Sequence, residues 1–129
     1  TIASLVFSGA VARYADIGFI FSHAGGTMPF LIERFDRLAL NPSTKAQLPR
    51  GVRHELAQFY YDTAQSANPS ALSCLLKIAP VSQVLYGTDF PFRTSIEHVE
   101  GLRTCGFSPA ELSAVERDNA LQLLPRLRR

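Results

Sequence analysis

Short, almost continuous apolar runs alternate along this chain with longer segments of helical periodicity. Three runs have the length and composition of buried strands: Ile17–Ser22, Gln58–Thr63 and Gln83–Gly87. Apolar residues at helical spacing precede the first run and follow each of the three. Strands that alternate with helices along a chain form parallel βαβ units. The pattern therefore predicts an α/β fold with a parallel sheet.

Start and stop signals divide the helical segments. Two Ser/Thr-x-x-Glu patterns, at Thr94 and Ser108, predict capping boxes. The stop signal Asn41-Pro42-Ser43 predicts the end of a helix that Pro29 opens. We expect helices over residues 2–14, from Pro29 to the stop at Asn41, weakly over residues 51–57, from Asn68 to Ala79, from Thr94 to Gly106, and over residues 119–124.

The length of the chain limits what the sheet can be. With 129 residues the chain holds one domain at most. Three parallel strands alone make a poor sheet, because both edges would expose unpaired backbone groups and apolar side chains. A (β/α)8 barrel typically needs ~250 residues, so a chain of this length can instead be about half of one.

Composition and charge exclude several classes of protein. The net charge of +2 is too small, and the basic residues are too scattered, to indicate nucleic-acid binding. No apolar run approaches the ~20 residues of a membrane-spanning helix. Cys74 and Cys105 form no Cys-x-x-Cys pair, so we expect buried free thiols rather than a metal or redox role. Free thiols and the lack of a visible secretory signal favour a reducing, cytoplasmic compartment.

Polar residues with useful chemistry follow the predicted strands. His23 comes directly after the first strand and Asp89 directly after the third, while Asp62 lies near the end of the second. The carboxyl ends of parallel strands carry the catalytic groups of α/β proteins. An imidazole can bind a metal or transfer a proton near neutral pH, and a carboxylate can bind a divalent cation. These positions indicate a metal or acid–base site at one edge of the sheet.

Each of these residues also has a structural interpretation. His23 can be a capping or surface residue, and Asp89 can cap a helix or complete a turn. Gly25-Gly26, ahead of a helix, can hold an anion on exposed amides or form a tight turn. His54 and His98 lie in charge-rich helical segments, where we expect them to be solvated.

Three segments resemble those of a known family. Phe21–Phe30 (FSHAGGTMPF) is similar to the Ser-His-Ala-Gly-Gly…Pro segment of the amidohydrolase superfamily, above all of its decarboxylase branch. That branch includes aminocarboxymuconate-semialdehyde, γ-resorcylate and 6-methylsalicylate decarboxylases. Leu85–Phe92 (LYGTDFPF) resembles the branch's Gly-Thr-Asp-aromatic-Pro segment. Asp118-Asn119-Ala120 with Leu123-Leu124 resembles the helix that closes these barrels, and the resemblance spans essentially the whole chain.

The resemblance implies a (β/α)8 TIM barrel of which residues 1–129 supply strands six to eight with their helices. It implies a divalent metal at the barrel mouth, most often zinc, with manganese as the alternative. Asp89 corresponds to the metal-binding aspartate after strand eight. His23 corresponds to the histidine after strand six, which transfers protons in the decarboxylases and is a metal ligand in some hydrolases.

Two further residues carry implied substrate contacts. Arg34 corresponds to an arginine that reaches the substrate of a neighbouring subunit in a dimeric decarboxylase, which makes the expected full-length protein a homodimer. Phe92 corresponds to an aromatic residue that lines the substrate pocket. The structural alternatives are an exposed helix charge for Arg34 and a core ring for Phe92.

The chain departs from the family pattern in its metal ligands. The His-x-His pair after strand one and the histidine of strand five are absent. A stable metal site needs about three protein ligands, and this chain offers Asp89 and His23. We therefore expect a C-terminal fragment that binds metal poorly by itself and is inactive.

The expected activity of the parent protein is metal-dependent, non-oxidative decarboxylation of a carboxylated aromatic or aromatic-derived acid, a small-molecule carboxylic acid substrate. Hydrolysis of a lactone or an amide on the same scaffold is one alternative. A non-catalytic barrel remnant that folds only with another chain is the other alternative.

Overall fold

Three short parallel strands form the centre of the structure, a computed structural model that describes residues 1–128. The strands are β1 (Ile20–Phe21), β2 (Tyr60–Asp62) and β3 (Val84–Leu85), in the spatial order β1-β2-β3. Both pairings are parallel. The predicted α/β fold with a parallel sheet is confirmed, although each strand is shorter than the apolar run that predicted it. The flanking residues of those runs leave the ladder for turns, such as the 3-10 turn Val81–Gln83 before β3.

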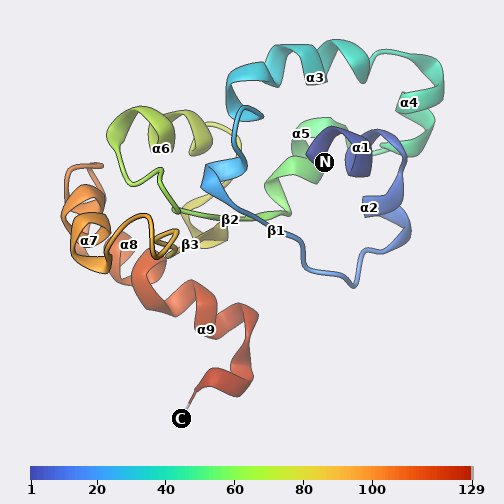
Figure 1. Cartoon of the computed structure of the whole chain (residues 1–129). Coiled ribbons are helices and arrows are strands. Elements are labelled where there is room, and N and C mark those ends of the chain that lie inside the picture. The colour runs from blue at the N-terminus through green and yellow to red at the C-terminus, as the bar shows by residue number, and fades with distance from the viewer. Residues whose placement is uncertain (129) are drawn as a thin grey trace.

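Helices precede, separate and follow these strands, as the sequence predicts (Figure 1). Short 3-10 turns lie at His23–Gly25, Pro29–Leu31 and Pro125–Leu127, and a π-helical turn, Ala114–Asp118, joins the last two helices. The α-helices are α1 (Ile2–Phe7), α2 (Ala10–Arg13), α3 (Ile32–Leu38), α4 (Pro42–Gln47), α5 (Val52–Ala57), α6 (Pro69–Leu75), α7 (Ser95–Arg103), α8 (Pro109–Ser113) and α9 (Asn119–Leu123).

Several helix boundaries differ from the prediction, and two of the differences have a clear local reason. The single helix expected over residues 2–14 is broken at Gly9, whose φ of 69° is left-handed and starts α2 afresh. The stop signal at Asn41 also starts a helix, because its side chain accepts the backbone N–H of Ser43 and caps α4. The two predicted capping boxes, at Thr94 and Ser108, are confirmed.

The hydrophobic core covers one face of the sheet. Phe21, Tyr61 and Val84 are opposite one another in the ladder and therefore point to the same face. Helices α1, α3, α5 and α6 lie on one side of the strands (Figure 1). Tyr61 is buried there and donates its hydroxyl to the carbonyl oxygen of Leu56 at 2.8 Å. Burial raises the pKa of the Tyr61 hydroxyl well above its ordinary value.

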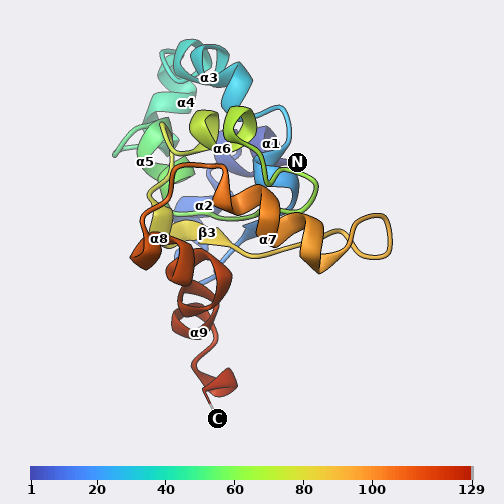
Figure 2. The same cartoon turned by 90° about the vertical axis from the view of Figure 1, so that its left-hand side faces the viewer.

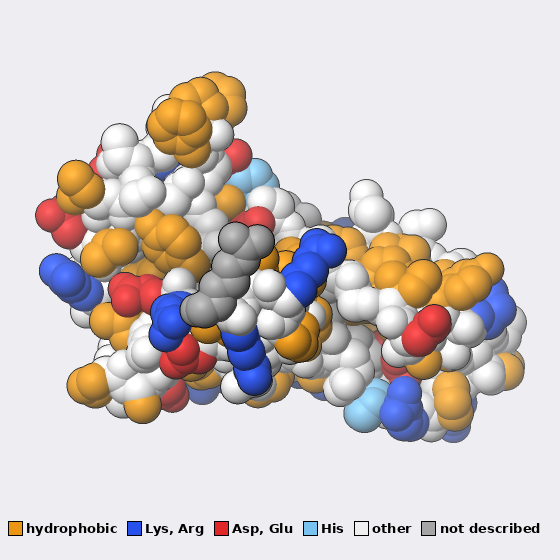
Figure 3. All heavy atoms as spheres, turned by 90° about the horizontal axis from the view of Figure 1, so that it is seen from below, with side chains coloured by type: hydrophobic (Ala, Val, Ile, Leu, Met, Phe, Trp, Pro, Cys, Tyr) orange, Lys and Arg blue, Asp and Glu red, His pale blue; other side chains and the backbone are white. Residues whose placement is uncertain are grey.

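The opposite face of the sheet is less covered. Ile20 on β1 is 50% exposed and its ladder partner Tyr60 is half-buried. Hydrophobic side chains reach the surface over much of the molecule seen from below (Figure 3). The strand order makes β1 and β3 the two edges, as expected for so small a sheet. In the view of Figure 2 the loop between β3 and α7 extends away from the body of the molecule.

The exposure of the cysteines and the hydropathy of the helices test the predictions of buried thiols and of no membrane-spanning segment. Cys74 is exposed and Cys105 half-buried, so the prediction of buried thiols is wrong for Cys74, which faces solvent on α6. Both thiols are free. Among residues 1–128, no helix has the length and apolar character required to cross a bilayer.

Helix α7 packs closely on the loop that follows β2. A Cβ atom added at Gly101 would overlap the backbone carbonyl oxygen of Ala67. The absence of a side chain at Gly101 therefore sets the distance between α7 and this loop.

We expect Gly101→Ala to lower the free energy of unfolding by ~1–3 kcal/mol, because the loop backbone must move to admit the methyl group. Urea unfolding followed by circular dichroism measures the change. Glu100→Ala, on the exposed side of the same helix, is the control and should change stability by less than about 0.5 kcal/mol. Equal stability of Gly101→Ala and wild type would contradict the close packing.

The capping box of α7 predicts a pH dependence. The Glu97 carboxylate accepts the backbone N–H and the hydroxyl of Thr94, each at 2.8 Å. The backbone hydrogen bond, and then the hydroxyl bond, lower the pKa of Glu97 below its ordinary value of 4.5. Since the folded pKa is the lower one, this stabilisation is present above pH 4.5 and is lost as the pH falls through the folded pKa.

An NMR titration of the Glu97 carboxyl carbon should give a midpoint below 4.5 in the wild type. Thr94→Ala should move the midpoint back toward the ordinary value, and Thr94→Ser should keep it low, because serine retains the hydroxyl. A wild-type midpoint at the ordinary value would show that the box does not form in solution.

Candidate active site at the carboxyl ends of the strands

His23 leaves the end of β1 with its ring held in one tautomer. Its Nδ1 lies 3.0 Å from the backbone carbonyl oxygen of Ala64. A carbonyl oxygen only accepts hydrogen bonds, so Nδ1 must carry the proton in this contact. In the neutral ring the lone pair then resides on Nε2. His23 thus offers one defined nitrogen for proton transfer or for a metal.

The carboxylate of Asp62 ties the ends of β1 and β2 together. It accepts the hydroxyl of Ser22 at 2.9 and 3.1 Å, the backbone N–H of His23 at 3.0 Å and the backbone N–H of Ala64 at 3.0 Å. Asp62, the third candidate of the sequence, is therefore engaged by its neighbours. Its observed contacts place the backbone from which the His23 ring extends.

Asp89 follows β3 and is held by a residue that the sequence analysis did not single out. Its Oδ2 accepts a hydrogen bond from the side-chain amide of Gln65 at 2.9 Å. The hydroxyl of Thr63 donates to the carbonyl oxygen of Gly87 and accepts its N–H, each at 3.0 Å. These bonds fasten the chain before Asp89 to the end of β2. A Cβ atom on Gly87 would lie 3.1 Å from the side chain of Asp62, which is tighter than an ordinary contact, so a larger residue would force Asp62 to shift slightly.

His23 and Asp89 are therefore hydrogen-bonded to two adjacent residues. Ala64 accepts from the His23 ring, and Gln65 donates to the Asp89 carboxylate. The structure brings both predicted residues to one edge of the sheet, through the segment 63–65 that follows β2.

Backbone strain gathers at this edge. Among residues 1–128, the non-glycine residues with positive φ are His23, Ala24, Gln65 and Asp89, with φ between 52° and 67°. A left-handed conformation costs roughly 1–2 kcal/mol for a residue with a side chain. Such strain persists where surrounding contacts impose it, and it is frequent at functional sites.

Arg34 and Phe92 stand apart from these contacts. Arg34 is exposed on α3 and has no ion-pair partner among the described residues. Phe92 is 79% exposed in the loop after β3, and its N–H donates to the carbonyl oxygen of Asp89 at 2.9 Å. The interpretation of Phe92 as a core ring is therefore wrong. Neither side chain takes part in the hydrogen bonds that hold the His23 ring and the Asp89 carboxylate.

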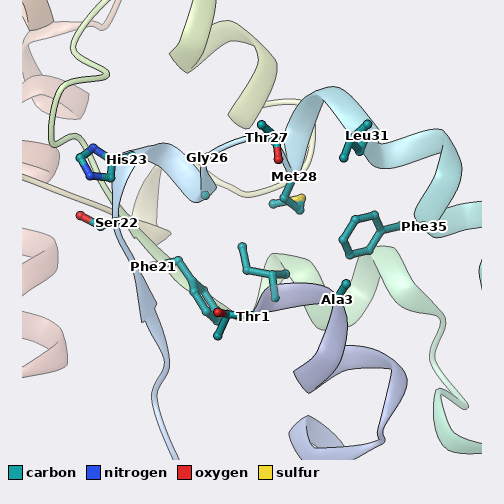
Figure 4. A pocket seen from close by; sticks show the side chains of 12 residues that line it. Thr1, Ala3, Phe21, Ser22, His23, Gly26, Thr27, Met28, Leu31 and Phe35 are labelled. Carbon is teal, nitrogen blue, oxygen red and sulfur yellow. The ribbon is translucent and has the colours of Figure 1, made fainter.

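A hydrophobic cavity of about 400 Å³ lies beside His23, but on the helix-covered face. Phe21, Met28 and Phe35 line it, and Figure 4 shows the imidazole ring of His23 turned away from them. Ser22 and His23 also line this cavity, so it reaches the end of β1 at which the candidate site lies.

The structure also decides two further sequence interpretations. Gly25-Gly26 forms a tight turn, in which the N–H of Gly26 donates to the carbonyl oxygen of His23 at 2.8 Å. His54 is half-buried with its Nε2 out of contact with solvent, so the prediction of a solvated ring is wrong there.

The prediction of a solvated ring is also wrong for His98, which is fully buried on α7. Its Nε2 accepts the backbone N–H of Gln65 at 3.0 Å. The sequence held a signal for this: His98 and Leu102 are one helical turn apart and share the buried face of α7. The neighbouring charges concealed that periodicity.

The donor atoms at this edge suit a divalent cation in kind. An imidazole nitrogen and a carboxylate oxygen are both ligands of zinc and of manganese. Within residues 1–128, however, no group of three or more His, Cys, Asp or Glu side chains is placed to hold a metal ion. His23 and Asp89 therefore fit a divalent cation by the chemistry of their donor atoms, and the described residues hold no complete metal site.

Known proteins similar to this chain include fungal decarboxylases. The chain is 38% identical to a 6-methylsalicylic acid decarboxylase of Penicillium expansum over 96% of its length, and 34% identical to one of Aspergillus aculeatus over 100%. It spans 40% and 42% of those relatives, respectively. The chain therefore covers well under half of either protein.

Solved structures share the fold of the chain. A 2,6-dihydroxybenzoate decarboxylase from Rhizobium superposes with a TM-score of 0.78 at 20% identity, covering 95% of this chain and 39% of that protein. A dihydroxybenzoic acid decarboxylase from Polaromonas, solved with manganese and an inhibitor, gives a TM-score of 0.80 at 19% identity, covering 99% and 40%. A sequence model of the family described as Amidohydrolase matches residues 1–126. This chain belongs to the amidohydrolase family.

Proposed function

We propose that this chain is the C-terminal part of a (β/α)8 barrel enzyme, with β1, β2 and β3 as strands six to eight. The proposed activity is metal-dependent, non-oxidative decarboxylation of a carboxylated aromatic acid. The observation that carries the proposal is the joint attachment of His23 and Asp89 to residues 64–65. The fungal relatives, named for 6-methylsalicylic acid, support this substrate class.

A divalent metal at this edge, zinc or manganese, would supply the positive charge that offsets the electrons left on the ring when CO2 departs. Asp89 would hold it through its carboxylate. His23 is the alternative ligand, but its one free nitrogen, Nε2, cannot bind the metal and carry a proton at once, and we propose that it carries the proton. The manganese bound in the Polaromonas decarboxylase supports a divalent cation. Further ligands would come from polypeptide outside these 129 residues.

His23 would carry the proton. Loss of CO2 breaks a carbon–carbon bond and leaves an electron pair on the ring carbon, which must take up a proton. The Ala64 carbonyl holds Nδ1–H, so the exchange with the substrate or with water takes place at Nε2. The fixed tautomer supports this role, because it keeps Nε2 available.

Substrate contacts would come from both subunits of a homodimer. The exposed guanidinium of Arg34 would pair with the carboxylate of a substrate in the neighbouring subunit. The exposed ring of Phe92, three residues beyond Asp89, would contact the aromatic part of the substrate.

Substitutions in the full-length protein test the two central residues. We expect His23→Ala to lower kcat by ~10²–10⁴-fold with metal content largely retained, because it removes the proton carrier. Asp89→Asn should lower both kcat and metal content. Asp16→Asn, an exposed carboxylate ahead of β1, is the matched control and should behave as wild type.

CO2 release from 6-methylsalicylic acid and bound metal by elemental analysis are the measurements. Near-normal turnover in either variant would remove that residue from the mechanism. Hydrolysis of a lactone or an amide by the wild type, without CO2 release, would replace the decarboxylase by a hydrolase of the same family.

A second prediction concerns the 129-residue chain by itself. Titration with zinc in a calorimeter should show weak binding, because the described residues gather no set of three ligands. Tight binding of one zinc per chain would contradict the proposal that further metal ligands come from polypeptide outside these residues.

A further inference from the structure

His98 is the fully buried histidine of residues 1–128, and the proposed reaction gives it no task. Its Nε2 accepts the backbone N–H of Gln65 at 3.0 Å. A backbone N–H only donates, so Nε2 must carry the lone pair. The ring packs edge-on against Tyr86, with centroids 6.5 Å apart and an interplanar angle of 84°.

The residue that His98 holds is Gln65, one of the two adjacent residues that are hydrogen-bonded to His23 and Asp89. Gln65 has a left-handed φ of 52°, which needs support from its surroundings. Its side-chain amide donates to Asp89 at 2.9 Å, and the preceding carbonyl, of Ala64, accepts from His23 at 3.0 Å. A shift of the Gln65 backbone would therefore move the partners of both His23 and Asp89.

Helix α7 gives His98 a fixed support. Its first turn is closed by the Thr94 capping box, and the hydroxyl of Tyr86 donates to the carbonyl oxygen of Ser95 at 3.0 Å. Gly101, one turn beyond His98, packs against Ala67 at the other end of the same loop. The loop is thus held on α7 at two points, one of them the bond from Gln65 to His98.

We propose that His98 is a positioning residue of the site. It contacts neither His23 nor Asp89; its Nε2 fixes residues 64–65, and these orient the imidazole of His23 and the carboxylate of Asp89. The consequence for metal binding and turnover rests on the proposed function. The hydrogen bond from Gln65 to His98 can be tested separately.

The matched substitutions are His98→Gln and His98→Asn in the full-length protein. Both introduce an amide, but the glutamine carbonyl reaches the place of the imidazole Nε2, whereas the shorter asparagine ends near the place of Nδ1. Only His98→Gln retains an acceptor for the N–H of Gln65. Both variants are measured by hydrogen exchange at residues 62–67, by Mn²⁺ affinity from electron paramagnetic resonance, and by kcat and KM.

We expect His98→Asn to speed exchange of the Gln65 amide by about tenfold or more, because the bond that protects it is lost. Mn²⁺ affinity should fall by ~10–100-fold, as is typical when a residue that orients a metal ligand is removed. kcat should fall with it, while KM stays within about threefold, because His98 does not touch the substrate. His98→Gln should stay within about threefold of wild type in every measurement.

Gln65→Leu separates positioning from folding, should His98→Asn fail to fold. It keeps the backbone N–H that bonds His98 and removes only the amide that bonds Asp89. We expect unchanged exchange of the Gln65 amide together with the loss of Mn²⁺ affinity. Wild-type Mn²⁺ affinity in Gln65→Leu would overturn the path from His98 to Asp89.

Other outcomes also decide the proposal. Wild-type exchange and Mn²⁺ affinity in His98→Asn would overturn it, and so would equal losses in His98→Gln and His98→Asn, because the acceptor would then be irrelevant. If the wild type releases no CO2 from an aromatic acid, the proposed function fails. The exchange and Mn²⁺ comparisons still confirm or overturn the role of His98 in that case.

Discussion

The carboxylate of Asp62 is the contact on which the edge of the sheet depends. A ladder of strands this short supplies few backbone hydrogen bonds, so the positions of the strand ends must be fixed by side chains. Asp62 accepts from Ser22, from the backbone of His23 and from that of Ala64. Bonds to an ionised acceptor contribute ~1.5–3 kcal/mol each. One carboxylate thus joins the residues after β1 to those after β2.

The segment after β2 also fixes the end of β3 and the residues of the candidate site. Thr63 exchanges two hydrogen bonds with Gly87, Ala64 accepts from the His23 ring, and Gln65 donates to Asp89. Three successive residues therefore contact both flanking loops. The same contacts explain the strained backbone, because left-handed residues at a cost of roughly 1–2 kcal/mol each need partners that hold them.

Parallel topology made the edge predictable, and local geometry made the rest unpredictable. Once short apolar runs and helices alternate, His23 and Asp89 must emerge at the same edge, wherever the imidazole and the carboxylate point. Gln65 lies in a loop and has no periodic pattern, so the sequence does not show whether its exposed amide bonds to Asp89. The burial of His98 was missed because charged neighbours concealed its spacing with Leu102, and the depth of that burial also depends on how closely Gly101 lets α7 approach the loop after β2.

The proposed barrel accounts for two features that are otherwise unrelated. The sheet has an edge strand, β1, whose Ile20 is half exposed, and the site has two candidate ligands where a metal needs about three. Further parallel strands beside β1 would cover Ile20. At their carboxyl ends, the same strands would supply the missing metal ligands. The same additional polypeptide would then complete both the sheet and the metal site. The orientation of His23 and Asp89, in contrast, is already set by the contacts of residues 62–65 within this chain.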